Sequence, residues 1–275
     1  MPEAKANGLK IHYDDLGRGE PALLCLPGWC ANRSVFRDLA ARCAAQRHVL
    51  SLDWRGHGTS ETPKGDFGVQ ELIRDALAVI ESSGAPQIVP VALAHAGWVA
   101  LDLCSELKER IPKLVFIEWI VTEAPMAFQE ALKGMQLAER WKATVNGIFD
   151  LWLHGVKNPA LERFVRSEMG QYGFAMWSRA AREIQAYYAK NGSPLRDETA
   201  DPDPAFVRAA ARPAGTSPRR SPSGRSTPGF SSRFLPFGVI SQCLKWRMIW
   251  PRRSRLFSVE FEASMGIRAT PLLAG

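Results

Sequence analysis

A stretch of twelve residues in the first half of the chain holds the side chains best placed to do chemistry. It runs from Val89 to Ala100, begins as an apolar strand-like run, breaks at very small residues and continues with helical spacing. This pattern predicts a sharp strand-to-helix turn that lifts one side chain above a sheet and tolerates only small neighbours. The usual form of the turn is G-x-S-x-G, but Ala94 stands where the serine would be. Because alanine carries no nucleophile, an ordinary serine-esterase mechanism fails at its first step.

Two further loops could place functional groups beside this turn. The apolar run Ala22–Leu26 is typical of a central strand and ends in Pro27–Cys30. A glycine-containing loop in that position can direct backbone N–H groups toward an oxyanion; a plain turn with Trp29 packed against a lid is the alternative. The strand-like run Leu114–Ile117 is followed directly by Glu118. Functional groups gather at the carboxyl ends of strands in open parallel sheets, so we expect these loops to meet.

The first 122 residues alternate strand-like and helical segments, which predicts an α/β fold with a mostly parallel sheet. Beyond the runs already named, strands are expected at Leu9–Tyr13 and His48–Trp54, and helices at Ser34–Arg47, Val69–Ser83 and Trp98–Arg110. Residues 123–192 are helical in pattern and rich in aromatics, as a lid would be. Lid aromatics could line a pocket for a flat or apolar substrate, or pack as ordinary core. We therefore expect a core over 1–122 and a helical lid over 123–192.

The string Asp53–Ser60 reads D-x-R-G-x-G-x-S and contains His57. A histidine in a loop after a strand invites a catalytic role. The interpretation we favour is structural, with His57 holding the loop.

Composition limits the class of protein. The chain has 275 residues, 46% of them hydrophobic and 23% charged, as in a globular protein. It shows neither a membrane-length apolar run nor the apolar core of a signal peptide, so we expect no membrane association. Five cysteines, an odd number without metal-ligand spacing, favour a reduced cytoplasmic protein without a metal.

The net charge of +7 comes entirely from the C-terminal part of the chain. Residues 196–275 hold thirteen basic and six acidic side chains, which accounts for the whole excess. The segment lacks the interleaved aromatics or the helix motif of nucleic-acid modules, so we expect no nucleic-acid partner. One interpretation of residues 193–275 is an irregular or disordered basic linker, rich in Pro, Arg and Ser.

The sequence resembles the cofactor-free ring-cleaving dioxygenases, the 1H-3-hydroxy-4-oxoquinoline and -quinaldine 2,4-dioxygenases, over roughly residues 8–195. The segments that carry the resemblance follow one another in the family's order. They are Gly28–Cys30, Asp53–His57, Ala94–His95, Glu118–Trp119, Phe149–Trp152, Glu168–Met169, Tyr172–Gly173, Met176–Trp177 and Asn191–Pro194. The resemblance implies an α/β-hydrolase fold with a helical lid, and no cofactor.

The resemblance also implies a reaction. A histidine base removes the 3-hydroxyl proton of a bound 3-hydroxy-4(1H)-quinolone, and the anion then reacts directly with O2. The ring opens between C2 and C4, with release of carbon monoxide and an N-acylanthranilate. Such chemistry needs a base, a carboxylate that orients it and a dry apolar pocket, but no serine nucleophile.

Site residues follow from the resemblance position by position. Trp29, Cys30 and Ala31 match the residues that contact the substrate, and His95 matches a residue whose ring or backbone N–H meets the substrate's oxygens. Trp152 matches the lid residue that packs on the bicyclic ring.

Two matching positions depart from the family's pattern. Glu118 stands where the family has aspartate, the partner of the catalytic histidine. Ala94 replaces a serine that hydrogen-bonds the substrate, so binding should be weaker. His95 and Glu118 are the catalytic candidates within the matching part of the chain.

The family's catalytic histidine lies in a His-Phe-Pro motif near the C-terminus, and this chain has no histidine after His154. Reverse translation suggests a reason. Ile240–Pro251 can be encoded so that reading one base earlier gives His-Phe-Pro-Met-Leu-Glu-Val-Ala-Asp-Asp-Leu-Ala, the family's terminal motif. Our hypothesis is that about the last eighty residues are an aberrant segment read out of frame, through a sequencing error or a real frameshift.

Three functions remain open from the sequence. The first is the quinolone dioxygenase, with an activity in this chain that depends on the missing base. The second is an esterase or other hydrolase of the same fold with another nucleophile, and the third is a non-catalytic binder of aromatic ligands. The 2-substituent of the substrate and the oligomeric state are not indicated.

Overall fold

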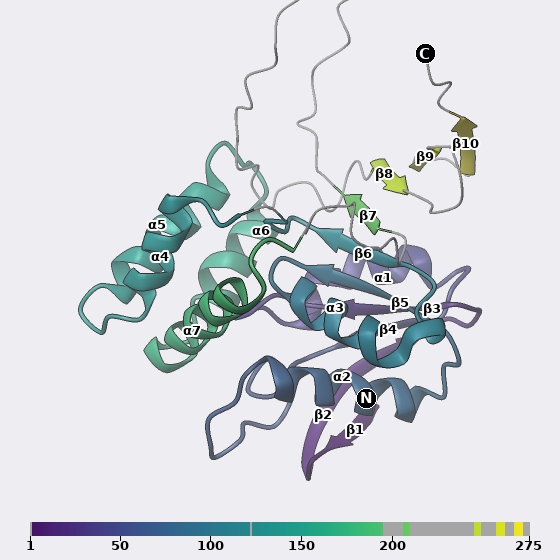
Figure 1. Cartoon of the computed structure of the whole chain (residues 1–275), viewed down its shortest axis with the longest axis horizontal. Coiled ribbons are helices and arrows are strands. Elements are labelled where there is room, and N and C mark those ends of the chain that lie inside the picture. Colours follow the sequence, from purple (N-terminus) through teal and green to yellow (C-terminus); the bar gives the residue numbers. More distant parts are fainter. Residues whose placement is uncertain are drawn as a thin grey trace, which may run out of the picture.

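One sheet of ten strands organises the molecule, in the order β1-β2-β4-β3-β5-β6-β7-β8-β9-β10. The computed structural model describes residues 2–121, 123–194 and the backbone of four short strands beyond them. Five neighbouring strands, from β4 to β7, run parallel, whereas the strands at both edges are antiparallel (Figure 1). The strands before the lid are β1 (Glu3–Ala6), β2 (Leu9–Leu16), β3 (Ala22–Leu26), β4 (Val49–Leu52), β5 (Ile88–Leu93) and β6 (Leu114–Ile117).

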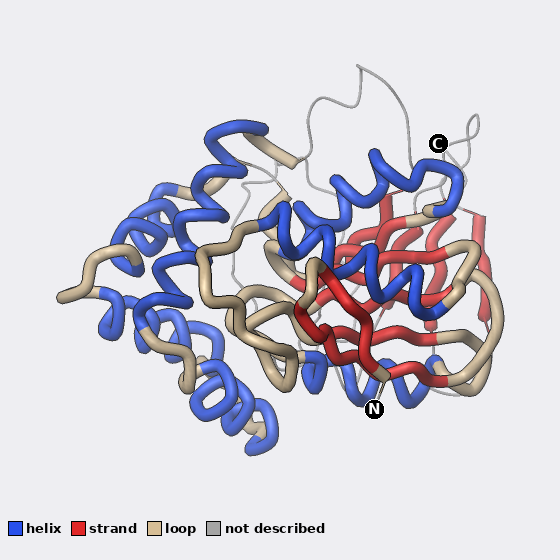
Figure 2. The backbone as a smooth tube through the Cα atoms, turned by 90° about the horizontal axis from the view of Figure 1, so that it is seen from below, coloured by secondary structure: helices blue, strands red, loops and turns tan. Residues whose placement is uncertain are grey.

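The central strands are apolar throughout because helices cover both faces of the sheet (Figure 2). All six residues of β5 and all four of β4 are buried. The helix α1 packs against one face, and α2 and α3 pack against the other. The predicted strands Ala22–Leu26 and Leu114–Ile117 and the predicted helix Val69–Ser83 are confirmed to the residue. The core helices are η1 (Arg33–Phe36), α1 (Arg37–Cys43), α2 (Val69–Ser83), α3 (Ala96–Leu107) and η2 (Lys108–Arg110).

One predicted helix is shorter than expected. The sequence suggested a single helix over Ser34–Arg47, but a 3-10 turn precedes α1, which ends at Cys43. The turn forms because the Asn32 side chain accepts the Ser34 N–H, while the neighbouring Arg33 is tied to Asp53 across the sheet edge. These polar contacts outweigh the helical periodicity of the segment.

The helices after β6 form a lid beside the sheet (Figure 1). They confirm the helical pattern of this part of the chain and are α4 (Met126–Met135), α5 (Trp141–Leu153), α6 (Pro159–Arg163), the π-helical η3 (Phe164–Met169) and α7 (Phe174–Asn191). Helix α7 is fastened to the core. The Glu183 carboxylate accepts the Val69 N–H at the start of α2, and the Tyr188 hydroxyl donates to the Ile120 carbonyl at 2.6 Å. None of the helices described is long and apolar enough to cross a membrane.

Four short strands extend the sheet beyond β6. Strand β7 pairs parallel to β6, and β8, β9 and β10 follow in antiparallel register. They are β7 (Phe206–Ala209), β8 (Lys245–Met248), β9 (Phe257–Phe261) and β10 (Ile267–Pro271). The expectations for the Pro-, Arg- and Ser-rich segment otherwise fall outside the described residues.

Candidate functional site

The loops after β3, β5 and β6 meet at the carboxyl edge of the sheet, as predicted. The Ala94 N–H, just after β5, donates to the carbonyl of Ile117, the residue before Glu118, at 2.8 Å. A Cβ placed on Gly28, in the loop after β3, would lie 3.7 Å from the Cβ of Ala94. The two loops that carry Trp29 and Glu118 therefore flank the turn that carries Ala94 and His95.

Each of these loops contains a non-glycine residue with left-handed backbone. The φ angles are 57° for Cys30, 49° for Ala94 and 50° for Glu118. Such angles cost on the order of 1 kcal/mol or more per residue and cluster at functional sites, where the surroundings enforce them. Five non-glycine residues of the described chain have positive φ, and three of them lie here. The strain marks this edge as the candidate site.

The turn at Ala94 depends on small residues. Helix α3 begins at Ala96, and the ring of Trp119 lies directly against Gly97. A Cβ on Gly97 would lie 2.3 Å from Cε3 of that ring, so only glycine fits. The predicted strand-to-helix turn is confirmed, with Ala94 at the strained position that a nucleophile would occupy.

His95 lies beside this turn among aromatic side chains from the lid. Its ring stacks on Phe128 of α4, with centroids 5.1 Å apart and planes at 14°, and meets the edge of Tyr188 of α7 at 5.9 Å. The Nδ1 atom is buried and has no hydrogen-bond partner among the described residues. Burial lowers the pKa of His95 from 6.5 to about 3. The imidazole is therefore neutral near pH 7 and has an uncommitted polar atom.

The loop after β3 is held by His57. The Cys30 N–H donates to His57 Nε2 at 3.1 Å, and Nδ1 lies 3.0 Å from the Arg55 carbonyl. Since the first contact needs an acceptor and the second a donor, the ring is neutral with the proton on Nδ1. Burial lowers its pKa to about 4. The favoured structural role of His57 is confirmed, and the Cys30 amide is not available to an oxyanion.

The string around Asp53 fastens the same loop to the core. The fully buried Asp53 carboxylate accepts the Arg33 and Thr59 N–H groups at 2.7 and 2.9 Å, and it also accepts from the Arg33 guanidinium and the Thr59 hydroxyl. Arg55 makes a buried ion pair with Asp75 at 2.6 Å. These contacts give the D-x-R-G-x-G-x-S string a role in shaping the site rather than in reacting.

Trp29 forms part of an aromatic wall. Its ring stacks on Phe67 at 6.0 Å, and the Arg179 guanidinium of α7 covers Phe67 at 4.3 Å. Trp29 also meets the edge of the His57 ring at 5.9 Å. The burial of this side chain also agrees with the alternative, a plain turn with Trp29 packed against the lid.

The remaining predicted residues are placed as follows. Ala31 is buried, and its N–H donates to the Gly28 carbonyl. Glu118 is half-buried at the end of β6. Trp152 is half-buried on α5, and its described ring contact is with Phe149 of the same helix, at 6.0 Å. The predicted place of Trp152 against a substrate stays a prediction.

Three lid residues at the site were not predicted as site residues, although Tyr172 lies in one of the segments that carry the family resemblance. Phe128 and Tyr188 contact His95, and the Tyr172 ring lies 5.1 Å from His57 while its hydroxyl accepts the Gly58 N–H. Each belongs to the aromatic pattern of 123–192. Only the packing of the lid on the sheet distinguishes them from the other aromatics there.

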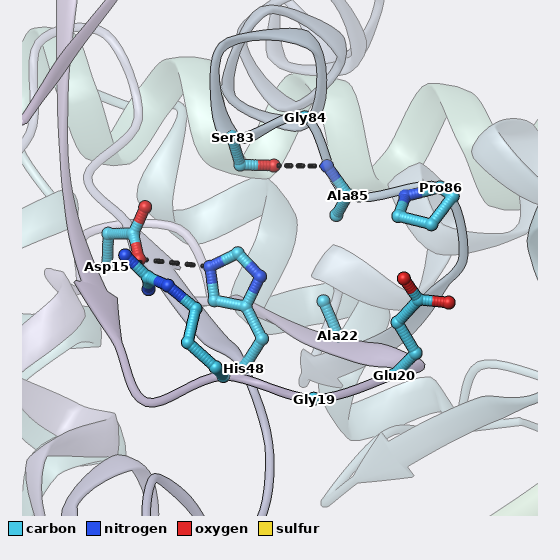
Figure 3. Close-up of a pocket in the computed structure, with 10 residues that line it drawn as sticks. Asp15, Gly19, Glu20, Ala22, His48, Ser83, Gly84, Ala85 and Pro86 are labelled. Carbon is cyan, nitrogen blue, oxygen red and sulfur yellow. Dashed lines mark hydrogen bonds and ion pairs between the residues drawn. The ribbon is translucent and has the colours of Figure 1, made fainter.

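A pocket of about 230 Å³ lies at the opposite edge of the sheet (Figure 3). Its lining includes Ala22 and His48, at the amino ends of β3 and β4, with His48 Nε2 3.0 Å from Asp15 Oδ1. Functional sites of open parallel sheets lie at the carboxyl ends instead. This pocket is therefore separate from the candidate site. Within the described part of the chain, no group of three or more His, Cys, Asp or Glu side chains could hold a metal ion.

Several known proteins are similar to this chain in sequence and structure. A family model described as the alpha/beta hydrolase fold matches residues 21–201. The 2-heptyl-3-hydroxy-4(1H)-quinolone dioxygenase of Mycobacteroides abscessus is 35% identical over 204 residues, which cover 74% of this chain and 76% of the relative. The solved structure of 1H-3-hydroxy-4-oxoquinoline 2,4-dioxygenase is similar with a TM-score of 0.71 and 33% identity, covering 78% of this chain and 82% of that one. A variant of AqdC in complex with its substrate, solved to explain ring cleavage of the Pseudomonas quinolone signal, gives a TM-score of 0.67 and 34% identity, covering 70% and 73%.

Proposed function

This chain belongs to the 3-hydroxy-4-quinolone 2,4-dioxygenases of the α/β-hydrolase fold, and from that premise we propose that its site binds a 3-hydroxy-4(1H)-quinolone for direct cleavage by O2. The proposed products are carbon monoxide and an N-acylanthranilate, and no cofactor takes part.

One observation supports this function above all. The strained position that presents a nucleophile in hydrolases of this fold carries Ala94, and the next residue presents a neutral imidazole with a buried, unpartnered Nδ1. Position 94 thus has no atom that could form an acyl-enzyme, but the neighbouring residue has a polar group that could bind an oxygen of an aromatic anion. The arrangement therefore favours the dioxygenase over an esterase.

The reaction balances without a reductant. A base takes the proton of the 3-hydroxyl group, and the electron-rich anion gives its electrons to O2. The resulting peroxide at C2 attacks C4 and bridges the two carbons. The O–O bond and the ring bonds C2–C3 and C3–C4 then break, so that C3 leaves as carbon monoxide. Both oxygen atoms of O2 remain in the N-acylanthranilate. The protein has to bind the anion, keep water out and hold the reacting groups in place.

The residues take distinct roles in this proposal. Trp29, Cys30 and Ala31 form the wall that contacts the quinolone, and Trp152 covers its bicyclic ring. The buried aromatic surroundings of Trp29 support the first role, because an apolar wall excludes water from the anion. His95 meets an oxygen of the substrate.

The four free cysteines of the described chain support the proposed cytoplasmic location.

The general base is the group that this chain lacks. No histidine follows His154, and the family model ends its match at residue 201. His95 is a poor substitute, because burial holds its pKa near 3. We propose that restoring the alternate reading frame returns the base, with Glu118 as its carboxylate partner. The chain as it stands then binds the quinolone and turns it over slowly or not at all.

A single set of assays tests the proposal. The chain is titrated with 2-methyl-3-hydroxy-4(1H)-quinolone without oxygen, then exposed to air and assayed for carbon monoxide, beside a frame-restored chain. We expect binding by both proteins and carbon monoxide from the restored one. Absence of quinolone binding, or hydrolysis of nitrophenyl esters by the chain, would overturn it. Binding by both chains without carbon monoxide from either would favour the non-catalytic binder.

A further inference from the structure

His95 lacks the device that usually orients a functional histidine. In most sites the second ring nitrogen donates to a carboxylate or a backbone carbonyl, which fixes both the tautomer and the ring plane. His57 in the same site is held at both nitrogens, since Nδ1 donates to the Arg55 carbonyl and Nε2 accepts the Cys30 N–H. The Nδ1 of His95 instead lies buried without a partner among the described residues. Something other than a hydrogen bond at this atom must fix the His95 ring.

Two lid aromatics provide the fixing contacts. Phe128 lies flat against the imidazole, with ring planes at 14°, and Tyr188 approaches it edge-on at 77°. The two aromatics also contact each other, with centroids 6.4 Å apart. Together they touch the imidazole from two nearly perpendicular directions, so that rotation of the ring about its Cβ–Cγ bond would break one contact or the other.

Phe128 and Tyr188 are themselves held in place by neighbouring elements. The Tyr188 hydroxyl donates to the Ile120 carbonyl at 2.6 Å, and its ring meets the edge of the buried Trp98 of α3 at 5.4 Å. Phe128 lies near the beginning of α4, whose residues Leu132 and Met135 are buried, and α4 packs against α5 and α7 of the lid. The orientation of His95 in the core thus depends on the seating of α4.

We propose that Phe128, backed by Tyr188, is the positioning residue of His95: it holds the imidazole by stacking so that its polar edge faces a quinolone oxygen. This inference rests on the proposed function for the identity of the ligand, but not for the contact itself. Phe128 also keeps water from one face of the ring. Burial is the sole cause of the lowered pKa of His95, so the stacked ring contributes directly to the neutral state.

The first test needs no substrate. The titration of His95 is followed by NMR in the full chain, with its signal assigned by its loss in His95→Gln. In Phe128→Ala, water reaches the imidazole and stabilises its charged form, so the pKa should rise from about 3 by about one unit or more. The matched control is Phe174→Ala, which removes a half-buried lid aromatic that contacts Trp141 at 6.2 Å, away from His95. The control should leave the His95 titration where it is.

A second variant separates two effects of Phe128, which are to cover the His95 ring and to orient it. It also serves if Phe128→Ala prevents the lid from folding. Phe128→Leu keeps an apolar side chain over the ring but loses its flat face. We expect the His95 pKa to stay low in this variant while the Kd for 2-methyl-3-hydroxy-4(1H)-quinolone, measured without oxygen, rises about tenfold, as for loss of one hydrogen bond to a charged group.

The outcomes distinguish the two proposals. An unchanged His95 titration in Phe128→Ala overturns the positioning role. So does a Kd in Phe128→Leu equal to that of the unmodified chain, because the flat face would then be unnecessary. If the unmodified chain does not bind the quinolone, the proposed function fails, while the titration still decides whether Phe128 controls His95.

Discussion

Protonation of His57 should destabilise the fold by a predictable amount as the pH falls. In the folded chain His57 must accept the Cys30 N–H, which an imidazolium cannot do. Its folded pKa of about 4 lies below the ordinary value of 6.5 that applies in the unfolded chain. Above the unfolded pKa both states carry a neutral ring, and the group makes no pH-dependent contribution. Below it, the unfolded chain takes up a proton that the folded chain refuses, so stability falls until the pH reaches the folded pKa.

The size of the effect follows from the two pKa values. One unit of difference corresponds to about 1.4 kcal/mol, and the full difference between 6.5 and about 4 gives a loss of about 3 kcal/mol. Between roughly pH 7 and pH 5, the loss from this single residue is about 2 kcal/mol. Urea unfolding at a series of pH values measures it.

The variant His57→Gln isolates this contribution. Its side-chain oxygen can reach the Cys30 N–H but does not titrate, so the stability curve should become flatter by about 2 kcal/mol over the same range. Burial also lowers the pKa of His95, so His95 makes stability fall with pH as well. This contribution is the same in the unmodified chain and in His57→Gln, and the difference between their two stability curves is therefore due to His57. His154→Gln, at an exposed histidine, is the control. Parallel curves for the unmodified chain and His57→Gln would refute the reasoning.

Further variants test the turn that carries the site. Gly97→Ala places a Cβ 2.3 Å from the Trp119 ring, so it should lower the free energy of unfolding in urea by about 1–3 kcal/mol. Gly147→Ala has open space around its Cβ and should be neutral or stabilising by about 1 kcal/mol. Equal effects of the two variants would contradict the packing argument. Ala94→Ser should tighten anaerobic quinolone binding about fivefold through one added hydrogen bond, measured as Kd, and unchanged or weaker binding would show that this position does not face the ligand.

The elements that the sequence predicts best are those with a simple local cause. The strands Ala22–Leu26 and Leu114–Ile117 are apolar runs with polar or proline-containing borders, and their limits are found as predicted. The strand-to-helix turn at Ala94 was predictable because a sharp turn of this kind tolerates only small neighbours, and a run of small residues follows an apolar strand here. Two predicted helices have other bounds in the structure. Trp98–Arg110 is found as α3 and the 3-10 turn η2, and Ser34–Arg47 begins with a 3-10 turn in which Arg33 contacts Asp53, a contact that no local pattern announces.

The sequence predicted that three loops meet at one edge of the sheet, but it did not predict the neighbours of His95. Loops after three parallel strands had to meet at one edge, so the proximity of Gly28, Ala94 and Glu118 follows from topology. The residues that contact the His95 ring could not be predicted from the topology. Phe128 and Tyr188 stand among many lid aromatics of equal appearance, and only the seating of the lid on the sheet distinguishes them.

The central claim is that the site admits an aromatic anion to direct reaction with dioxygen once a base is present. The most direct measurement uses the frame-restored chain with a 3-hydroxy-4(1H)-quinolone under isotopically labelled dioxygen, with mass analysis of the N-acylanthranilate. We predict carbon monoxide release and both labelled oxygen atoms in the product. A product that carries oxygen from water, or no ring cleavage at all by the restored chain, would contradict the account.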